Sequence, residues 1–454
     1  MIAKQLIYLA GAEAAGIVLG ARVPIVLTSR ADGTLARLAS CAVAQAFAAL
    51  RREPEEWRQS VSDAILVFNA GSSSIKFALY ETVSLEPLCR GVLEGIGRAV
   101  RLNLDAKAGA SSRSRFAKPP ETAIHAELTG WLLQEICRVY DTTNIVGAGH
   151  RVVHGGQGYA DPVLVDADVL SALSALIPLA PNHQPHNLAP INAIANLWPS
   201  LPQVACFDTA FHRTQPRIAQ LFALPRKYLD GGILRYGFHG LSYDFIAGVL
   251  PDYAGPRAGG RVIVAHLGHG ASMCALKDGR SVATTMGFTA LDGLMMGKRC
   301  GALDPGVILH LLQQKGMSTE DVANLLNNQS GLLGVSGCSD DVRDLEASDD
   351  PNAEEALSLF AYRAAREIGS LAAAAGGLDV LVFTAGIGEH SAAMRQRICT
   401  ASGWLGIGLD DAANQRHGPK ISHTDSSVDV FVIPTDEEIV IARATWRLAA
   451  GLAQ

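Results

Sequence analysis

The chain has no long apolar run. No stretch of about 18 or more apolar residues occurs in it, whereas a membrane-spanning helix needs about 20. The first ten residues are apolar enough to resemble a signal peptide, but Glu13 cuts the run short. We therefore predict no export signal and no membrane span, and we expect a cytoplasmic protein.

Cysteines are few, and an excess of basic charge is missing. The eight cysteines form no C-x-x-C pair, so neither a disulfide framework nor a zinc site is indicated. The 38 Lys and Arg residues against 44 Asp and Glu residues give a net charge of −6. This balance argues against nucleic acid or an anionic membrane as the main partner. Anionic substrates must therefore be bound by local cations.

The composition is that of a globular α/β enzyme. Hydrophobic residues make up 48% of the chain, and 45 glycines suit many tight loops better than a helical bundle. A chain of 454 residues exceeds the usual size of a single core, so we expect two or three domains.

Residues 65–79 predict two apolar strands joined by a polar turn. In this turn Asn69 offers an amide, Gly71 allows close backbone approach, and the serines at 72–74 add hydroxyls. Such a turn can hold phosphate. Taken alone, however, a Ser-Gly turn is more often a plain hairpin.

The pattern returns about 200 residues later. Residues 262–276 again give strand, polar residue, glycine, serine and strand, with His266 in the place of Asn69 and Gly268 in that of Gly71. The repeat favours a duplicated fold that holds a phosphate chain between its halves.

Three further glycine-rich segments each carry a cation or a histidine. They are residues 149–156 with Arg151, residues 235–240 with His239 and residues 295–301 with Arg299. Taken singly, each fits an ordinary surface or core residue. Together they can neutralise the oxygens of a transferring phosphoryl group, a reaction in which positioning and charge carry most of the catalysis.

Apolar strands that end in polar turns indicate where the site lies. We expect them at residues 145–147, 204–207, 262–267, 380–384 and 430–433. Ligand loops of an open sheet follow the carboxyl ends of its strands, so the functional residues should lie on these turns.

From about residue 64 to its end, the chain resembles the acetate kinase family of the acetate and sugar kinase/Hsp70/actin superfamily. The family's motifs occur in order at residues 69–76, 150–156, 207–212, 235–240, 384–389 and 433–438. The resemblance implies an α/β fold of duplicated actin/Hsp70-like (ribonuclease H-like) domains with a ligand cleft between them. The domains would be residues 61–208 plus 439–454 and residues 209–438.

The resemblance also implies catalytic roles. Arg151 and Arg299 would hold the substrate carboxylate and the transferring phosphoryl group, and His239 would donate a hydrogen bond to it. Asp208 matches the family's catalytic aspartate; an N-cap of a helix starting near Thr209 is the alternative. A carboxylate substrate is already ionised at pH 7, so no strong general base is required.

Further site residues follow from the same resemblance. Mg²⁺, or Mn²⁺ as the alternative, would be held through Asn69 and Glu437. The substrate pocket would be formed by Arg151, Val153, Asn182 and Phe238. The nucleotide would be bound by Lys76, His266, Gly268, His269, Gly270, Asp341, Arg343, Gly386, Ile387, Gly388 and His390. The alternatives are structural histidines at 266 and 269 and a capped helix start at 341–343.

Some positions depart from the family pattern. The family usually has Asn where His269 and His390 stand, His in place of Tyr243, Leu in place of Asn182 and Asp in place of Ala302. These departures concern the nucleotide contacts, the acyl pocket and the segment around Arg299.

Residues 1–60 form a separate segment. Residues 14–32 and 38–44 resemble the C-terminal end of phosphate acetyltransferase, and a charged stretch around Pro54 follows as a linker. Since a fragment cannot hold a complete acetyl-CoA site, we expect a non-catalytic appendage or a start codon assigned inside a preceding gene. A functional link to phosphate acetyltransferase is expected.

The sequence thus predicts a homodimeric kinase that converts acetate and ATP into acetyl phosphate and ADP. Propionate kinase is the first alternative, and butyrate kinase a weaker one. Two alternatives of other classes stay open. They are a non-catalytic nucleotide-binding switch and a binding partner of phosphate acetyltransferase.

Overall fold

The structure is a computed structural model that describes residues 17–18, 25–26, 62–71, 74–97, 99–105, 116–121 and 123–450. Ser72, Ser73 and most of the segment that resembles phosphate acetyltransferase lie outside the described residues. The chain divides into two compact units, Met1–Ser62 and Asp63–Gln454. In the first unit, β1 (Ile17–Val18) pairs antiparallel with β2 (Ile25–Val26).

The second unit contains two sheets, of which the first has the strand order β6-β5-β4-β3-β7-β9-β8. Its strands are β3 (Ser62–Ala70), β4 (Ser74–Glu81), β5 (Pro87–Glu94), β6 (Arg101–Leu104), β7 (Thr143–Val152), β8 (Val163–Leu164) and β9 (Gln203–Phe207). Strands β3 to β6 form an antiparallel meander, whereas β7 and β9 run parallel.

The second sheet has the order β12-β11-β10-β13-β14. Its strands are β10 (Arg261–Leu267), β11 (Ala271–Lys277), β12 (Arg280–Thr284), β13 (Val380–Thr384) and β14 (Asp429–Val432). As in β5-β4-β3-β7-β9, an antiparallel meander of three strands is extended by two strands that run parallel to each other. The repeated order confirms the duplicated α/β fold, and the five expected strands are all present.

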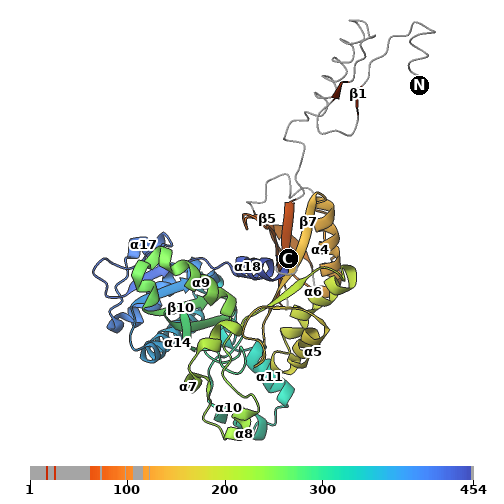
Figure 1. Cartoon of the computed structure of the whole chain (residues 1–454). Helices are drawn as coiled ribbons and strands as arrows, with labels where there is room; N and C mark the ends of the chain where they lie inside the picture. The colour runs from red at the N-terminus through yellow and green to blue at the C-terminus, as the bar shows by residue number, and fades with distance from the viewer. Residues whose placement is uncertain are drawn as a thin grey trace, which may run out of the picture. The chain divides into compact units, whose positions relative to one another are not determined.

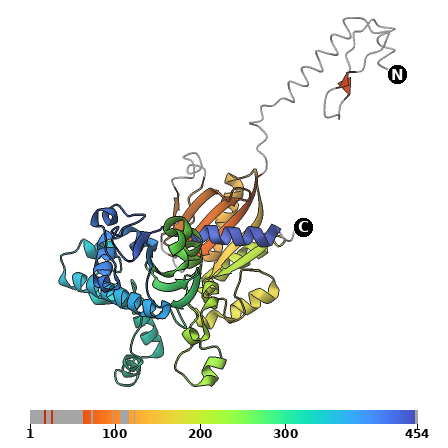
Figure 2. The same cartoon turned by 60° about the vertical axis from the view of Figure 1, so that its left-hand side comes forward.

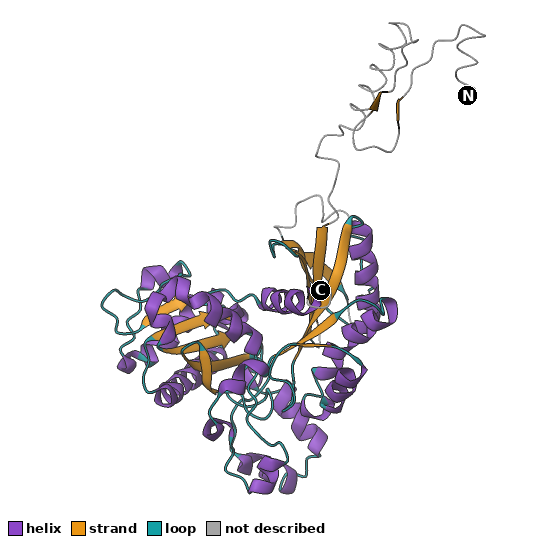
Figure 3. Cartoon of the chain, viewed as in Figure 1, coloured by secondary structure: helices purple, strands orange, loops and turns teal. Residues whose placement is uncertain are grey.

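Helices cover both faces of each sheet (Figures 1 and 3). On the first sheet, α4 (His125–Val139) and α6 (Gln184–Leu197) pack against one face, and α18 (Glu437–Ala450) lies across the other, as Figure 2 shows in blue. On the second sheet, α14 (Pro351–Ala375) and α16 (Ala392–Ala401) cover one face and α9 (Gly240–Ala254) the other. Burial on both faces explains why the central strand β10 is apolar between Arg261 and His266.

Shorter elements connect these layers. The remaining helices are α5 (Ala167–Ala175), α7 (Arg217–Gln220), α8 (Arg226–Asp230), α10 (Pro305–Gln313), α11 (Thr319–Asn328), α12 (Gly331–Ser336), α13 (Val342–Glu346), α15 (Ala385–His390) and α17 (Asp411–Gln415). The 3₁₀ turns are η2 (Ile177–Leu179), η3 (Ala210–Thr214), η4 (Gly255–Gly259) and η5 (Gly403–Leu405). Within the described ranges, no helix combines the length and apolar character that crossing a bilayer requires. The seven cysteines in these ranges are free thiols.

One local expectation was wrong. A polar turn was expected to follow the strand at residues 380–384, but residues 386–388 lie inside the short helix α15. Glu389 explains the difference, because its carboxylate accepts a hydrogen bond of 2.7 Å from the Ala385 N–H. An unpaired N–H at the start of the helix is thereby satisfied in spite of the two glycines.

Candidate active site

The two related hairpins meet at one cavity of about 470 Å³. From the first sheet and its neighbours it is lined by Asn69, Gly71, Ser74, Lys76, Arg151, Glu437 and Glu438. From the second it is lined by His239, His266, Gly268, His269, Gly270, Ala385, Gly386, Glu389 and Thr435. Both polar turns therefore contribute backbone and side-chain donors to the same space.

Arg151, which lines this cavity, forms a largely buried ion pair with Asp208. They stand at the carboxyl ends of the neighbouring parallel strands β7 and β9. Arg151 Nη2 lies 2.6 Å from Asp208 Oδ2, and Arg151 Nε donates to the same carboxylate at 3.0 Å. Burial raises the pKa of Asp208, and the charge of Arg151 opposes that rise. The pair fixes the guanidinium while leaving its side chain 17% exposed.

The structure does not support the capping alternative for Asp208. The turn η3 begins after Thr209 as its N-cap, with no side-chain cap bond. Asp208 is fully buried and directs its carboxylate at Arg151 instead. Its backbone oxygen accepts a hydrogen bond of 2.9 Å from the N–H of Gly240. This contact fixes the start of α9 next to the ion pair.

Asn69 organises two carboxylates on the same side of the cavity. Its Nδ2 donates to Glu437 Oε2 at 3.0 Å and to Glu438 Oε1 at 3.1 Å, and its Oδ1 accepts from Arg151 Nη1 at 3.2 Å. Burial alone would raise the pKa of Glu437, but Arg151 and other nearby cations lower it. Glu437 and Glu438 thus present negative oxygen atoms at the start of α18.

Arg299 is the second cation of the site, and it is held differently. Its Nη1 donates to the backbone oxygen of Ala290 at 2.6 Å, and no carboxylate of the described residues forms an ion pair with it. Burial, and then the charge of Arg151, lower its pKa to about 10. Arg299 is therefore still protonated at neutral pH, with a positive charge that an anion can neutralise.

Three histidines near the arginines are uncharged. Burial and the neighbouring charges hold the pKa of His239 well below its usual range. Burial, followed by Arg299 and Arg151, lowers the pKa of His183 to about 4, and burial lowers that of His266 to about 4. At neutral pH these imidazoles can donate or accept single hydrogen bonds but add no positive charge.

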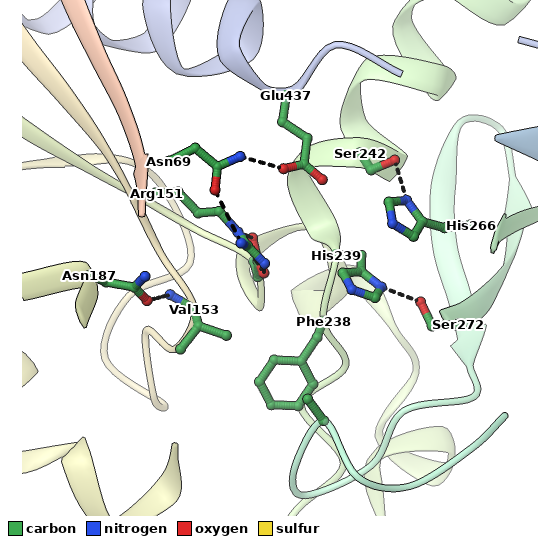
Figure 4. Close-up of polar contacts among 12 residues, drawn as sticks. Asn69, Arg151, Val153, Asn187, Phe238, His239, Ser242, His266, Ser272 and Glu437 are labelled. Atoms are coloured by element: carbon green, nitrogen blue, oxygen red, sulfur yellow. Dashed lines mark hydrogen bonds and ion pairs between the residues drawn. The ribbon is translucent and has the colours of Figure 1, made fainter. Parts of the chain in front are cut away.

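The expected acyl pocket is present only in part. Val153 and Phe238 are both buried in one apolar cluster that also contains Ala180. The N–H of Val153 donates to Asn187 Oδ1 at 2.9 Å (Figure 4). Asn182, in contrast, is exposed and does not line the cavity. Its assignment to the pocket stays a prediction without a supporting contact.

A second cavity of about 470 Å³ adjoins the first and shares Gly268, His269 and Gly386 with it. Its other lining residues are Asp340, Asp341, Val342, Arg343, Glu346, Ile387, His390 and Ser391. Most residues expected at the nucleotide thus line one of the two cavities. Gly388 lines neither of them; it is buried in α15.

Two of these nucleotide-side residues make local contacts of their own. Asp341 caps α13 by accepting from the N–H of Arg343 at 2.9 Å, as the alternative interpretation expected. His269 Nε2 lies 2.7 Å from Asp340 Oδ2, and the side chain of His269 is 63% exposed. A contact of these residues with a nucleotide stays a prediction.

Several residues of the site were not identified from the sequence. Asn187 joins the end of β7 to the first phosphate turn, because its Nδ2 donates to the Ala70 oxygen at 2.6 Å. Ser272 bonds the ring of His239 at 2.8 Å. Glu389 and Glu438 lie within motifs that carry the family resemblance, which was the available signal for them. For Asn187 the sequence offered no signal.

Comparison with known proteins places the chain in a family. Residues 64–443 match the model of the acetokinase family. The acetate kinase of Rhodopseudomonas palustris is 54% identical over 399 residues, covering 86% of this chain and all of that protein. The acetate kinase of Rhizobium meliloti is 48% identical, covering 86% of this chain and 99% of the relative.

Solved structures agree in fold. A propionate kinase from Francisella tularensis superposes with a TM-score of 0.79 at 36% identity, covering 85% of this chain and all of that one. The acetate kinase of Porphyromonas gingivalis gives 0.75 at the same identity and coverage. Both the sequence match and the fold extend over the residues that build the cavity, and the chain belongs to the acetokinase family.

Proposed function

We propose that this protein is an ATP:acetate phosphotransferase that reversibly forms acetyl phosphate and ADP. The observation that carries the proposal is the meeting of two phosphate hairpins and Arg151 at one cavity, with Arg299 next to Gly270 of its lining. A phosphate chain would lie between the hairpins, and a small carboxylate would lie near Arg151, Arg299 and the apolar pair Val153 and Phe238. The adjoining cavity would take the nucleoside.

The proposed mechanism needs charge and positioning more than proton transfer. The carboxylate of acetate is already ionised at neutral pH and can attack phosphorus directly. Arg299 and Arg151 would stabilise negative charge on the transferring oxygens, and His239 would donate a hydrogen bond to one of them. Asp208 would act on Arg151, holding its guanidinium in one orientation. This role agrees with the bidentate contact and requires no catalytic base.

The family implies a divalent metal, and the donors present fit Mg²⁺. Glu437 and Glu438 offer carboxylate oxygens, and Mg²⁺ is commonly held by one or two carboxylates together with water and substrate phosphates. No group of three metal-binding side chains occurs in the described part of the chain. Asn69 would orient the two carboxylates, because its oxygen is engaged by Arg151. When bound, the ion would neutralise phosphate oxygens.

Glu437→Gln should weaken the dependence on Mg²⁺. The amide keeps the shape of the side chain but loses its charge, so we expect the half-saturating Mg²⁺ concentration to rise about tenfold. Initial rates over a titration of free Mg²⁺ measure this. Glu355→Gln, at an exposed position on α14, is the matched control and should titrate like the wild type. An unchanged Mg²⁺ dependence in Glu437→Gln would remove this residue from the metal site.

Propionate is the second candidate substrate. The likeness of this fold to that of the Francisella tularensis propionate kinase favours propionate as a substrate. One additional methylene changes discrimination in an apolar pocket by only about 1–3 kcal/mol. Acyl phosphate formation with acetate, propionate and butyrate, trapped as hydroxamate, tests the proposal, and we expect the highest kcat/KM for acetate.

We infer that residues 1–60 are a non-catalytic appendage of a cytoplasmic enzyme linked in function to phosphate acetyltransferase. The apolar clusters of the described second unit begin at Ala64. The helix α18 packs on the first sheet, which supports counting residues 439–454 with residues 61–208.

Deleting residues 1–60 should therefore leave the kinase intact. We expect a shortened chain starting at Val61 to fold and to form acetyl phosphate at the wild-type rate, because the described cores of the second unit are built from later residues. The full chain should show no acetyl transfer from acetyl phosphate to CoA. Loss of kinase activity on deletion would make the segment part of the fold, and acetyl-CoA formation would contradict its non-catalytic role.

We further propose a homodimer in which α10 contacts a second copy. All nine residues of α10 are described, and none of them is buried. Two of its apolar side chains are exposed, Val307 by 41% and Leu309 by 52%. An uncovered apolar helix of this kind is typical of an interface. Val307→Asp combined with Leu309→Asp should yield monomers in sedimentation velocity. Ile124 is 61% exposed at the start of α4, so Ile124→Asp is the control and should stay dimeric. If the double variant also stayed dimeric, α10 would not form the dimer interface.

A further inference from the structure

The ring of His239 ends a chain of three hydrogen-bonded side chains that leads away from the cavity. Ser272 Oγ lies 2.8 Å from His239 Nδ1, and Tyr243 Oη lies 2.5 Å from Ser272 Oγ. Tyr243 and Ser272 are fully buried. The three residues come from α9, β11 and the segment just before α9, so the fold alone brings them together.

We propose that Tyr243 and Ser272 are positioning residues that keep the proton of the neutral His239 imidazole on Nε2, the nitrogen that faces the phosphoryl site. This assignment rests on the proposed phosphoryl transfer for its catalytic meaning. The tautomer itself is a property of the free protein.

The geometry shows why Nε2 is the functional nitrogen. A Cβ on Gly270 would lie 3.5 Å from His239 Nε2 and 2.7 Å from Arg299 Nη2. Both nitrogens therefore face the backbone of the second phosphate turn. A hydrogen-bond donor at Nε2 would act beside the free charge of Arg299, whereas an unprotonated Nε2 would present a lone pair to an anionic ligand.

The order of donors along the chain follows from counting protons. Ser272 has one hydroxyl proton and can accept two hydrogen bonds, but accepting from both neighbours would leave its own buried proton without a partner among the described residues. It therefore donates to one neighbour and accepts from the other. If Tyr243 donates to Ser272, then Ser272 donates to Nδ1, and the ring proton is on Nε2. The reverse order would leave the phenolic proton of Tyr243 without an acceptor, since Ser272 is its one hydrogen-bond partner in the described ranges. A buried unpaired donor costs about 1–3 kcal/mol.

The surroundings keep both groups in one charge state. Burial raises the pKa of Tyr243 well above 10, so its phenol remains a donor. The ring of His239 stacks on that of His266 with centroids 4.2 Å apart, and burial, His266, Arg151, Arg299 and His212 all lower its pKa. A doubly protonated His239 ring would therefore be unfavourable. What remains to be fixed is which of its two nitrogens carries the single proton.

The neighbouring His266 repeats the arrangement. Its Nδ1 lies 2.8 Å from Ser242 Oγ, which lies 2.9 Å from Thr435 Oγ1. Each stacked ring thus has its own hydroxyl at Nδ1, and both have Nε2 left for the cavity that they line.

Nitrogen NMR on the full-length protein tests the proposal without relying on turnover. With ¹⁵N-labelled histidine, and with His239→Gln to assign the signals, we expect shifts of an unprotonated Nδ1 and a protonated Nε2 at neutral pH. A proton on Nδ1, or rapid averaging between the two tautomers, would overturn the proposal. If acetyl phosphate formation fails while the expected tautomer is found, the proposed function is rejected and the tautomer assignment stands.

Kinetics of variants provide the second test. Tyr243→Phe should lower kcat about tenfold, the lower range for losing an orienting partner of a histidine, while the KM values for ATP and acetate stay within about twofold. Ser272→Ala should act in the same direction, and Ser272→Thr should restore most of kcat because it keeps the hydroxyl. Tyr140→Phe, which removes a phenol bonded to the Leu88 oxygen instead, is the control. Unchanged kcat and unchanged nitrogen shifts in Tyr243→Phe would refute the positioning role of Tyr243. If this variant fails to fold, the tautomer of His239 measured in the wild-type protein tests the proposal.

Discussion

Replacing Arg299 with alanine should lower kcat for acetyl phosphate formation by about two to three orders of magnitude, the usual cost of removing one charge-stabilising group from a water-poor site. The melting temperature should stay close to that of the wild type. The positive charge of Arg299 is buried and near Arg151, and these surroundings lower its pKa to about 10. Its hydrogen bond to the Ala290 oxygen is lost, but the repulsion between two buried cations is relieved.

Two variants sharpen the test of Arg299. Arg299→Lys should recover little of kcat, because an ammonium lacks the planar fork that can bind two oxygens at once. Arg416→Ala removes an exposed guanidinium of the same size and should behave as wild type. A wild-type kcat in Arg299→Ala would contradict the catalytic role of Arg299, and a large fall in the melting temperature would indicate a structural role instead.

Asp208→Asn should lower both kcat and stability. The amide keeps the size of the side chain but removes the charge that pairs with Arg151 at 2.6 Å. Removing one partner of a buried ion pair costs about 3 kcal/mol or more, and a guanidinium without its anchor no longer presents one orientation to the phosphoryl group. We expect kcat to fall by at least about two orders of magnitude. Denaturant unfolding and initial rates measure the two effects.

The matched control for Asp208 is another carboxylate paired with an arginine. Asp379 also binds a guanidinium through two oxygens, that of Arg261, but the Arg261 side chain is 41% exposed. Asp379→Asn should therefore cost at most about 1 kcal/mol and leave kcat unchanged. If Asp208→Asn were as mild as Asp379→Asn, the view that Asp208 positions a catalytic arginine would be wrong.

The fold was predictable because its main signals are local. Apolar strands interrupted by polar turns are visible in any short window, and the repeat of one such hairpin at residues 262–276 pointed to the duplication that both sheets show. The cations also stood in short glycine-rich segments. Arg151, His239 and Arg299 could thus be identified from their sequence neighbours alone, and the fold brings all three near one another.

The rest of the site depends on contacts between distant residues. Asn187 forms a hydrogen bond with Ala70, more than a hundred residues away in the sequence. Ser272 on β11 forms one with His239, which precedes α9. No local sequence pattern predicts either contact. The polar turn expected after residues 380–384 is helical at residues 386–388, because the carboxylate of Glu389 overrides the low helix preference of the two glycines. Asn182 aligned with an acyl-pocket position, yet it lies on the surface.

The central claim is that this cavity transfers a phosphoryl group between ATP and a short carboxylate. Hydroxamate trapping of acyl phosphate, run on the full-length protein with Mg-ATP and acetate, propionate or butyrate, tests it most directly. We expect acyl phosphate that depends on both ATP and the acid, with acetate giving the highest kcat/KM. ATP hydrolysis that is independent of the carboxylate, with no hydroxamate formed, would contradict this claim and identify the protein as a nucleotide-binding switch.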